Sequence, residues 1–178
     1  MKTMEEKKLH YVVVTGIIVK DGKYLITKRS EKEKAFPGLW TVPGGKLRKS
    51  DYASLPKDTA DHWYNVLEKL LEREIEEEVG LKVKNIRYLL SLSFIRADSI
   101  PTIIISLYCD YDSGEVKLSE ESVDYIWVSV NELDKYQFVP GLREEIELVD
   151  KRLKEDKHNG WSGKYDSASD KSLRDGIT

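Results

Sequence analysis

A helical stripe of leucines that changes into glutamates strongly limits what this chain can fold into. The segment 70–81, LLEREIEEEVGL, holds five glutamates and one arginine within residues 72–78. On a helix that turns about 100° per residue, one face carries three leucines: Leu67, Leu70 and Leu71. Such a face has to pack on a core. The pattern therefore predicts an amphipathic helix in a folded domain, with carboxylates at its C-terminal end.

The glutamates that continue the leucine face are Glu74, Glu77 and Glu78. A glutamate run is commonly a solvated face, but these three are expected on the buried side, where unpaired charge is costly. They also stand in the last turns before Gly80, at the negative end of the helix dipole, and they repel one another. Arg73 can neutralise one of them, Glu77 at i+4. The cluster therefore predicts a bound cation, and carboxylate oxygens suit Mg²⁺ or Mn²⁺.

Composition restricts the partners of this chain. With 178 residues, of which 40% are hydrophobic and 34% charged, it suits one compact domain. A net charge of -3 gives no electrostatic reason to expect a nucleic-acid or membrane-surface binder, so a small-molecule partner is favoured. The lone Cys109 lies in an apolar run, which predicts a buried, inert thiol. Because the N-terminal residues are charged and lack an apolar stretch, the expected location is the cytoplasm.

Strand patterns recur along the chain. β-branched runs on either side of Asp21 and Gly22 predict a hairpin over 11–29. A short strand between glycine turns is expected in 36–46, followed by a long, polar, irregular loop over 50–61. Further apolar runs predict strands at 85–96, 102–111 and 123–130.

Two helices accompany these strands. The first is predicted over 59–79 and ends at Gly80. Its candidate N-caps are three residues whose side chains accept backbone hydrogen bonds: Asp58, Thr59 and Asp61. The second helix is predicted over 141–156, with one apolar face formed by Leu142, Ile146, Val149 and Leu153. Strands and helices mixed in this way indicate an α/β fold.

The glutamate-rich segment resembles a known signature. Residues 73–81, REIEEEVGL, look like the second half of the Nudix hydrolase signature, Arg-Glu-apolar-x-Glu-Glu-x-Gly-apolar, and match it at every specified position. Residues 38–46, GLWTVPGGK, resemble the segment that leads into it, with Gly45 as its opening glycine. The resemblance covers roughly 10–155 and implies the family's α/β/α sandwich with a mixed sheet. A Nudix domain over 1–156, followed by a polar tail over 157–178, is therefore expected.

Two departures from the family pattern stand out. Arg73 follows Gly45 by 28 positions, which makes this connection 14 residues longer than the family spacing. The family also has a glutamate eight residues before the arginine, where this chain has Asn65. Asp61 or Glu68 could supply the missing carboxylate.

The resemblance implies hydrolysis of a nucleoside diphosphate linked to another moiety, with Mg²⁺ or Mn²⁺ as cofactor. A pyrophosphate is polyanionic, so an acidic pocket needs metal ions to bind it, and this chemistry supports the same reaction. By the resemblance, the metal ligands are Glu74, Glu77, Glu78 and the Gly45 carbonyl, and Arg73 orients the glutamates.

The sequence offers several candidates for the general base and the substrate contacts. In some members of the family a helix glutamate is the base, and in others a later loop supplies it, which makes Glu121 the candidate here, with Glu120 second. The substrate-binding candidates are Arg29, Trp40, Tyr52 and Trp63. Each has an alternative interpretation: Arg29 can pair with a nearby acid, Trp40 can pack in the core, and the loop aromatics can cover the helix.

Two other function classes compete with a hydrolase. A non-catalytic, nucleotide-sensing Nudix-like protein would normally lack a signature glutamate or carry a DNA-binding domain. An isomerase acting on an isoprenoid diphosphate would want a cysteine near the site, whereas Cys109 is predicted in a strand. The expected partner is thus a nucleotide-type small molecule, with no nucleic acid and no membrane. Nucleoside triphosphates, sugar nucleotides and oxidised nucleotides are all candidate substrates, and a homodimer is compatible with this prediction.

Overall fold

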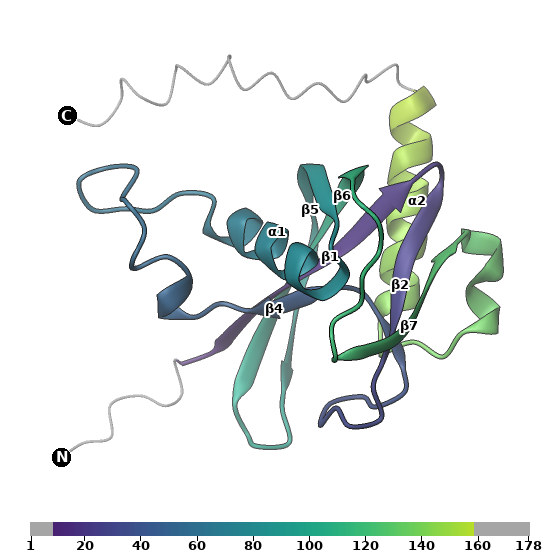
Figure 1. Ribbon diagram of the computed structural model, residues 1–178, viewed down its shortest axis with the longest axis horizontal. Helices are drawn as coiled ribbons and strands as arrows, with labels where there is room; N and C mark the ends of the chain where they lie inside the picture. The colour runs from purple at the N-terminus through teal and green to yellow at the C-terminus, as the bar shows by residue number, and fades with distance from the viewer. Residues whose placement is uncertain (1–8, 159–178) are drawn as a thin grey trace.

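A mixed seven-stranded sheet lies between two helices in this protein, whose computed structural model describes residues 9–158. Helix α1 covers one face of the sheet and α2 the other (Figure 1). The α/β sandwich expected from the sequence is confirmed. In chain order the strands and helices are β1 Tyr11–Lys20, β2 Lys23–Arg29, β3 Trp40–Thr41, β4 Gly44–Lys46, α1 Val66–Val79, β5 Lys82–Ile95, β6 Pro101–Ser113, β7 Ser122–Val128 and α2 Leu142–His158.

The sheet is centred on β1. Its strand order is β3-β2-β1-β6-β5, with β4 paired to β1 and β7 paired to β2. Strands β1 and β6 are parallel, and the other pairs are antiparallel. β1 pairs with β4 through Val13, Val14 and Thr15, and with β2 only at its far end, through Val19 and Lys20. This division of β1 places the short β4 beside α1.

The opening hairpin forms where the sequence predicts it. Asp21 and Gly22, which join β1 to β2, have φ angles of 50° and 72°. Two successive residues with positive φ make the turn whose twist matches paired antiparallel strands. The Asp-Gly pair therefore fixes the register that brings Val19 opposite Tyr24.

Each face of the sheet has its own apolar core. The core beneath α1 contains Cys109 and nine other buried residues: Val14, Ile18, Leu25, Leu70, Leu71, Ile75, Val79, Leu81 and Leu107. Cys109 is fully buried, as expected, and this burial raises the pKa of its thiol to about 12. The core beneath α2 is formed by Ile17, Tyr24, Ile26, Val42, Leu89, Tyr108, Val128, Leu133, Leu142, Ile146 and Val149.

Helix α1 begins later than the sequence predicts. It starts at Val66, and Asn65 precedes it in the left-handed conformation, with φ of 54° and no capping hydrogen bond from its side chain. The predicted start near residue 59 is therefore wrong. The reason is local: Asp58 accepts a hydrogen bond from the Tyr64 amide at 2.9 Å, and the Thr59 hydroxyl accepts one from the His62 amide at 3.0 Å. These side chains stabilise a turn that competes with the helix.

The other helix boundaries agree closely with the sequence. Gly80 ends α1 with φ of 70°, and its amide donates to the Glu76 carbonyl at 3.0 Å. Helix α2 buries Leu142, Ile146 and Val149 as expected. It runs to His158, and the remainder of the predicted tail, 159–178, lies outside the described residues. Neither helix in the described part of the chain is long and apolar enough to span a membrane.

Candidate active site

The buried side of α1 is rotated relative to the predicted stripe. Its fully buried residues are Leu70, Leu71, Ile75 and Val79. The sheet-facing ridge thus continues from Leu71 through Ile75 to Val79 at i+4 steps, which is how helix ridges usually pack. The prediction that all three glutamates continue the buried face is wrong, because the Glu77 side chain is 58% exposed. Glu74 and Glu78 lie beside the ridge and are partly buried.

Glu78 points toward the first residue of β4, Gly44. The Gly44 amide donates a hydrogen bond to its carboxylate at 3.4 Å. Burial raises the pKa of the Glu78 carboxyl to about 8, the Gly44 hydrogen bond opposes that rise, and the charges of Glu121 and Glu74 add to it. Glu121 belongs to the loop before β7, so the fold brings the predicted loop glutamate near the helix glutamates.

Gly45 lies directly against Glu74. A Cβ atom added at Gly45 would stand 2.3 Å from the Glu74 carboxyl carbon, so the Glu74 side chain would have to shift. Glycine at this position therefore lets the Glu74 carboxylate lie directly against β4. Burial raises the pKa of the Glu74 carboxyl, and Arg73 opposes that shift.

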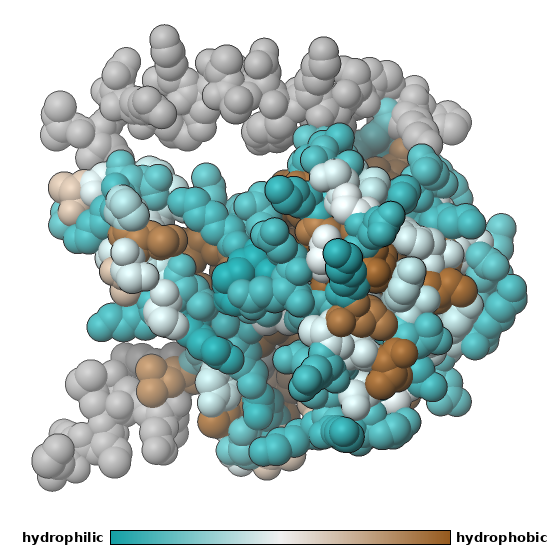
Figure 2. Space-filling view, in the orientation of Figure 1, coloured by the Kyte–Doolittle hydropathy of each residue, from teal (hydrophilic) through white to brown (hydrophobic). Residues whose placement is uncertain are grey.

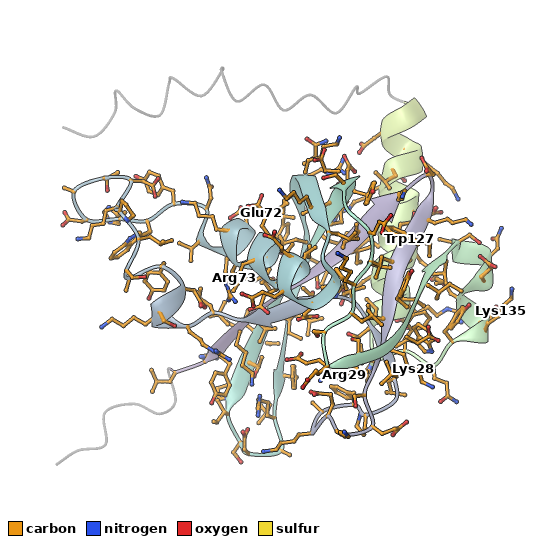
Figure 3. The ribbon with its side chains drawn as sticks, viewed as in Figure 1. Lys28, Arg29, Glu72, Arg73, Trp127 and Lys135 are labelled. Carbon is orange, nitrogen blue, oxygen red and sulfur yellow. The ribbon has the colours of Figure 1, made fainter. Side chains whose placement is uncertain are left out.

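Arg73 connects three carboxylates. Its Nη1 lies 2.8 Å from Glu77, and its Nη2 lies 2.7 Å from Glu74 and 3.3 Å from Asp51. Figure 3 shows Arg73 and Glu72 on different sides of α1, and Figure 2 shows hydrophilic residues over the outward side of this helix. The sequence predicts the pair with Glu77 but not Asp51, because that contact spans an irregular loop whose path no periodicity reveals.

The oxygen atoms that this site offers are of the kind that a hard cation binds. Carboxylates and a backbone carbonyl are the ligand types that such cations prefer. Glu74 and Glu78 converge on Gly44 and Gly45 at the start of β4, where the missing Cβ of Gly45 leaves room for the Glu74 carboxylate. Glu77 is turned toward Arg73 instead. Among residues 9–158, no three His, Cys, Asp or Glu side chains are already gathered as a metal cluster. The ligand chemistry therefore fits a divalent cation, and Glu77 is the side chain that would have to move.

The loop before β7 places Glu120 and Glu121 differently. Both side chains are exposed, and the charge of Glu121 contributes to the raised pKa of Glu78. The Glu121 carbonyl accepts a hydrogen bond from the Ser30 amide at 2.8 Å, which attaches this loop to the end of β2.

Two candidate substrate contacts are engaged within the protein. Arg29 pairs with Glu33 at 2.9 Å and donates to the Ala35 carbonyl at 2.7 Å. It still lies within electrostatic reach of Glu78, near the start of β7 (Figure 3). Trp40 packs edge-on against Tyr136, with ring centres 5.1 Å apart, and borders the core beneath α2. These contacts favour a structural role for Trp40.

The aromatic residues of the long connection pack on one another. Tyr52 and Trp63 meet edge-on with ring centres 5.4 Å apart, and the Trp63 ring nitrogen donates to the Leu55 carbonyl at 2.9 Å. Tyr64 beside them is 54% exposed. The connection is therefore a loop that its own side chains hold together, and it includes a short 3-10 turn over Lys49–Asp51.

Comparison of the sequence with known families finds the NUDIX domain over residues 10–149. A nucleoside triphosphatase from Escherichia coli, NudI, is 30% identical over 146 residues, which cover 76% of this chain and 94% of that protein.

Comparison of the structure gives neighbours of the same kind. The MutT protein from Methanosarcina mazei superposes with a TM-score of 0.62 at 26% identity, covering 83% of this chain and 98% of that one. A MutT NUDIX hydrolase from Burkholderia pseudomallei superposes with a TM-score of 0.63 at 25% identity, covering 80% of this chain and 99% of that one.

Proposed function

Because the chain belongs to the Nudix hydrolase family and is a Nudix pyrophosphohydrolase, we propose that it cleaves a pyrophosphate bond in a nucleotide with the help of Mg²⁺ or Mn²⁺. The observation that carries this proposal is the convergence of Glu74 and Glu78 on Gly44 and Gly45 at the start of β4. Since NudI is described as a nucleoside triphosphatase, nucleoside triphosphates are the first substrates to test. The proposed location is the cytoplasm, where a thiol such as Cys109 stays reduced.

Each residue has a distinct proposed role. Glu74, Glu78 and the Gly45 carbonyl would hold the cation, and Glu77 would join them when it leaves Arg73. A bound divalent cation supplies charge neutralisation for the pyrophosphate and lowers the pKa of water. Arg73 orients Glu74 through their 2.7 Å contact.

The proposal is tested with a panel of nucleoside triphosphates and diphosphate-linked nucleotides, each incubated with Mg²⁺ or Mn²⁺. Released phosphate and pyrophosphate are measured separately, because their ratio identifies the bond that is cleaved. Activity is expected to vanish in chelator and to return with added cation. Nucleotide binding without turnover of any substrate would instead favour the non-catalytic, nucleotide-sensing alternative.

Gly45→Ala is expected to lower turnover by about tenfold, as changes beside metal ligands commonly do. The added Cβ would overlap the Glu74 carboxyl group and displace it. Turnover at saturating cation and thermal unfolding are measured together. Gly22→Asn is a matched control, because Gly22 is an exposed hairpin residue with positive φ, which asparagine tolerates, and no atom would meet its Cβ. Normal turnover of Gly45→Ala would show that the contact of Glu74 with β4 does not matter for catalysis.

The loop segment 50–63 is proposed to govern substrate choice rather than the chemical step. Its ends are tethered beside Gly45 and α1, and Tyr52 and Trp63 offer flat surfaces for a base. Replacing 53–62 by a short Gly-Ser linker, with Asp51 and both aromatics retained, should change KM and the ranking of substrates. The best remaining kcat should stay within about tenfold of the parent value, since uniform binding contacts act on KM. If the shortened protein folds and ranks the nucleotide panel as the parent does, the loop only covers the helix.

A further inference from the structure

The outer edge of β5 has two unlike halves, and one of them is suited to pairing with another strand. Within residues 9–158, β5 pairs only with β6, so no strand lies along its other edge. The hairpin of β5 and β6 extends beyond both helices (Figure 1). We propose that residues 90–95 of β5, the open edge, pair with the same residues of a second copy of this chain to form a dimer. This proposal does not depend on the hydrolase reaction.

The first half of β5 is protected against such pairing. Its register with β6 shifts at three places between residues 82 and 90. Its basic side chains are Lys82, Lys84 and Arg87. Arg152 of α2 also donates a hydrogen bond to the Tyr88 carbonyl at 3.2 Å, which occupies a backbone acceptor of this half. Bulges and charged side chains are the features by which natural sheets keep an edge from pairing.

The open edge lacks these features. Its register with β6 is regular from Leu90 to Ile95. Its sequence, LSLSFI, contains no charged residue, proline or glycine. The side chains of Phe94 and Ile95 are 40% and 76% exposed. A flat, apolar and exposed edge of this kind offers its backbone groups to another strand.

The sequence of the open edge is complementary to itself. Two copies of one strand pair antiparallel about a two-fold axis, and opposite residues then point to the same side of the sheet. With the axis at Leu92, Leu90 lies opposite Phe94 of the second copy, and Ser91 lies opposite Ser93 of the second copy. Apolar side chains thus meet apolar side chains, and hydroxyl groups meet hydroxyl groups. Cross-strand pairs of these kinds stabilise sheets.

The charges beside the open edge also fit a second copy. Arg96 and Asp98, in the turn after β5, form their own ion pair at 3.0 Å. In the proposed register this turn lies toward residues 86–88 of the second copy, where Arg87 is paired with Asp110. Each group of charges is balanced within its own copy, so the two copies approach without like-charge repulsion. Because a second copy supplies this match along the whole open edge, it is the favoured partner over an unrelated strand.

The paired stretch is short, so the dimer is expected to depend on concentration. A strand edge of this length buries less surface than the roughly 1,600 Å² of a standard stable interface. The full chain is expected to sediment as a dimer at about 100 µM and to dissociate toward about 1 µM. Analytical ultracentrifugation across this range measures the association. A chain that stays monomeric at every concentration would overturn the proposal.

Paired charge variants test the open edge and its register together. Ser91→Lys combined with Ser93→Lys places lysine opposite lysine twice, which should weaken dimerisation by at least about tenfold. Ser91→Lys combined with Ser93→Glu places lysine opposite glutamate, which should restore the dimer. Val123→Lys, at a 60% exposed position of β7, is the control for an added lysine and should leave the dimer unchanged. A dimer that the lysine pair leaves intact, or that the lysine–glutamate pair does not restore, would contradict the proposed pairing.

A disulfide reports the register directly, and it decides the question even where the lysine pair prevents folding. Leu92→Cys should give a disulfide-linked dimer on mild oxidation, because residue 92 meets its own copy at the axis within reach of a disulfide. Phe94→Cys should not, because its two copies lie roughly 14 Å apart along the strands at about 3.4 Å per residue. Cys109 does not interfere, since it is fully buried. Cross-linking of Phe94→Cys without cross-linking of Leu92→Cys would overturn the proposed register.

Discussion

Glu78→Gln is expected to lower turnover by at least about 100-fold, because it removes a charged ligand from the proposed cation site. The fold should remain intact, because an amide oxygen can still accept the Gly44 hydrogen bond. Burial and the charges of Glu121 and Glu74 make an ionised Glu78 unfavourable without a cation. The unfolding midpoint in chelator should therefore hold or rise. Loss of activity with retained stability is the combination that a purely structural glutamate would not give.

The same helix offers matched variants for this measurement. Glu76 is exposed on the outward side, so Glu76→Gln should leave turnover near that of the parent. Glu77→Gln should also lower turnover by at least about 100-fold if Glu77 joins the cation site. This variant also weakens the ion pair between Glu77 and Nη1 of Arg73. Near-normal turnover of Glu78→Gln at saturating Mg²⁺ would show that the metal site lies elsewhere.

The elements set by local chemistry could be read from the sequence. The hairpin follows from Asp21 and Gly22, whose positive φ angles match the required turn. The end of α1 follows from Gly80, which adopts the left-handed conformation that glycine favours. In both places one or two residues decide the backbone, so distant contacts are not needed for the prediction.

The start of α1 and its buried face are set by contacts that a helical sequence pattern does not reveal. Asp58 and Thr59 resemble helix caps, yet their side chains close a turn before the helix. A wheel drawn from the leucines alone placed Glu77 inside, whereas Ile75 and Val79 define the true packing ridge. The amphipathic pattern is compatible with either of two buried faces, one with Glu77 and one with Ile75 and Val79. Packing on the sheet buries the face with Ile75 and Val79.

For the loop residues of the site, the sequence indicated which side chains could act but not where they lie in space. Glu121 could be proposed because a resemblance pointed to its loop, and the fold brings it near Glu78. Asp51 stands six residues after Gly45, the spacing that the family pattern gives its glutamate, but counting back from Arg73 across the longer connection pointed to Asn65 instead. Contacts of this kind depend on the path of a loop, and single-sequence patterns do not determine that path.

Glu121→Gln should lower turnover by about 100-fold, the usual contribution of a general base, with little change in cation affinity. The reason is its position: Glu121 is exposed and close to Glu78, so it could take a proton from water without being a main ligand of the cation. Glu120→Gln is the matched control, because Glu120 is the exposed neighbour of Glu121 in the same loop. Turnover and calorimetric cation binding are measured for both variants. Near-parental turnover of both Glu121→Gln and Glu120→Gln would indicate that a helix glutamate is the base. A loss of cation affinity in Glu121→Gln would indicate that Glu121 is a ligand of the cation.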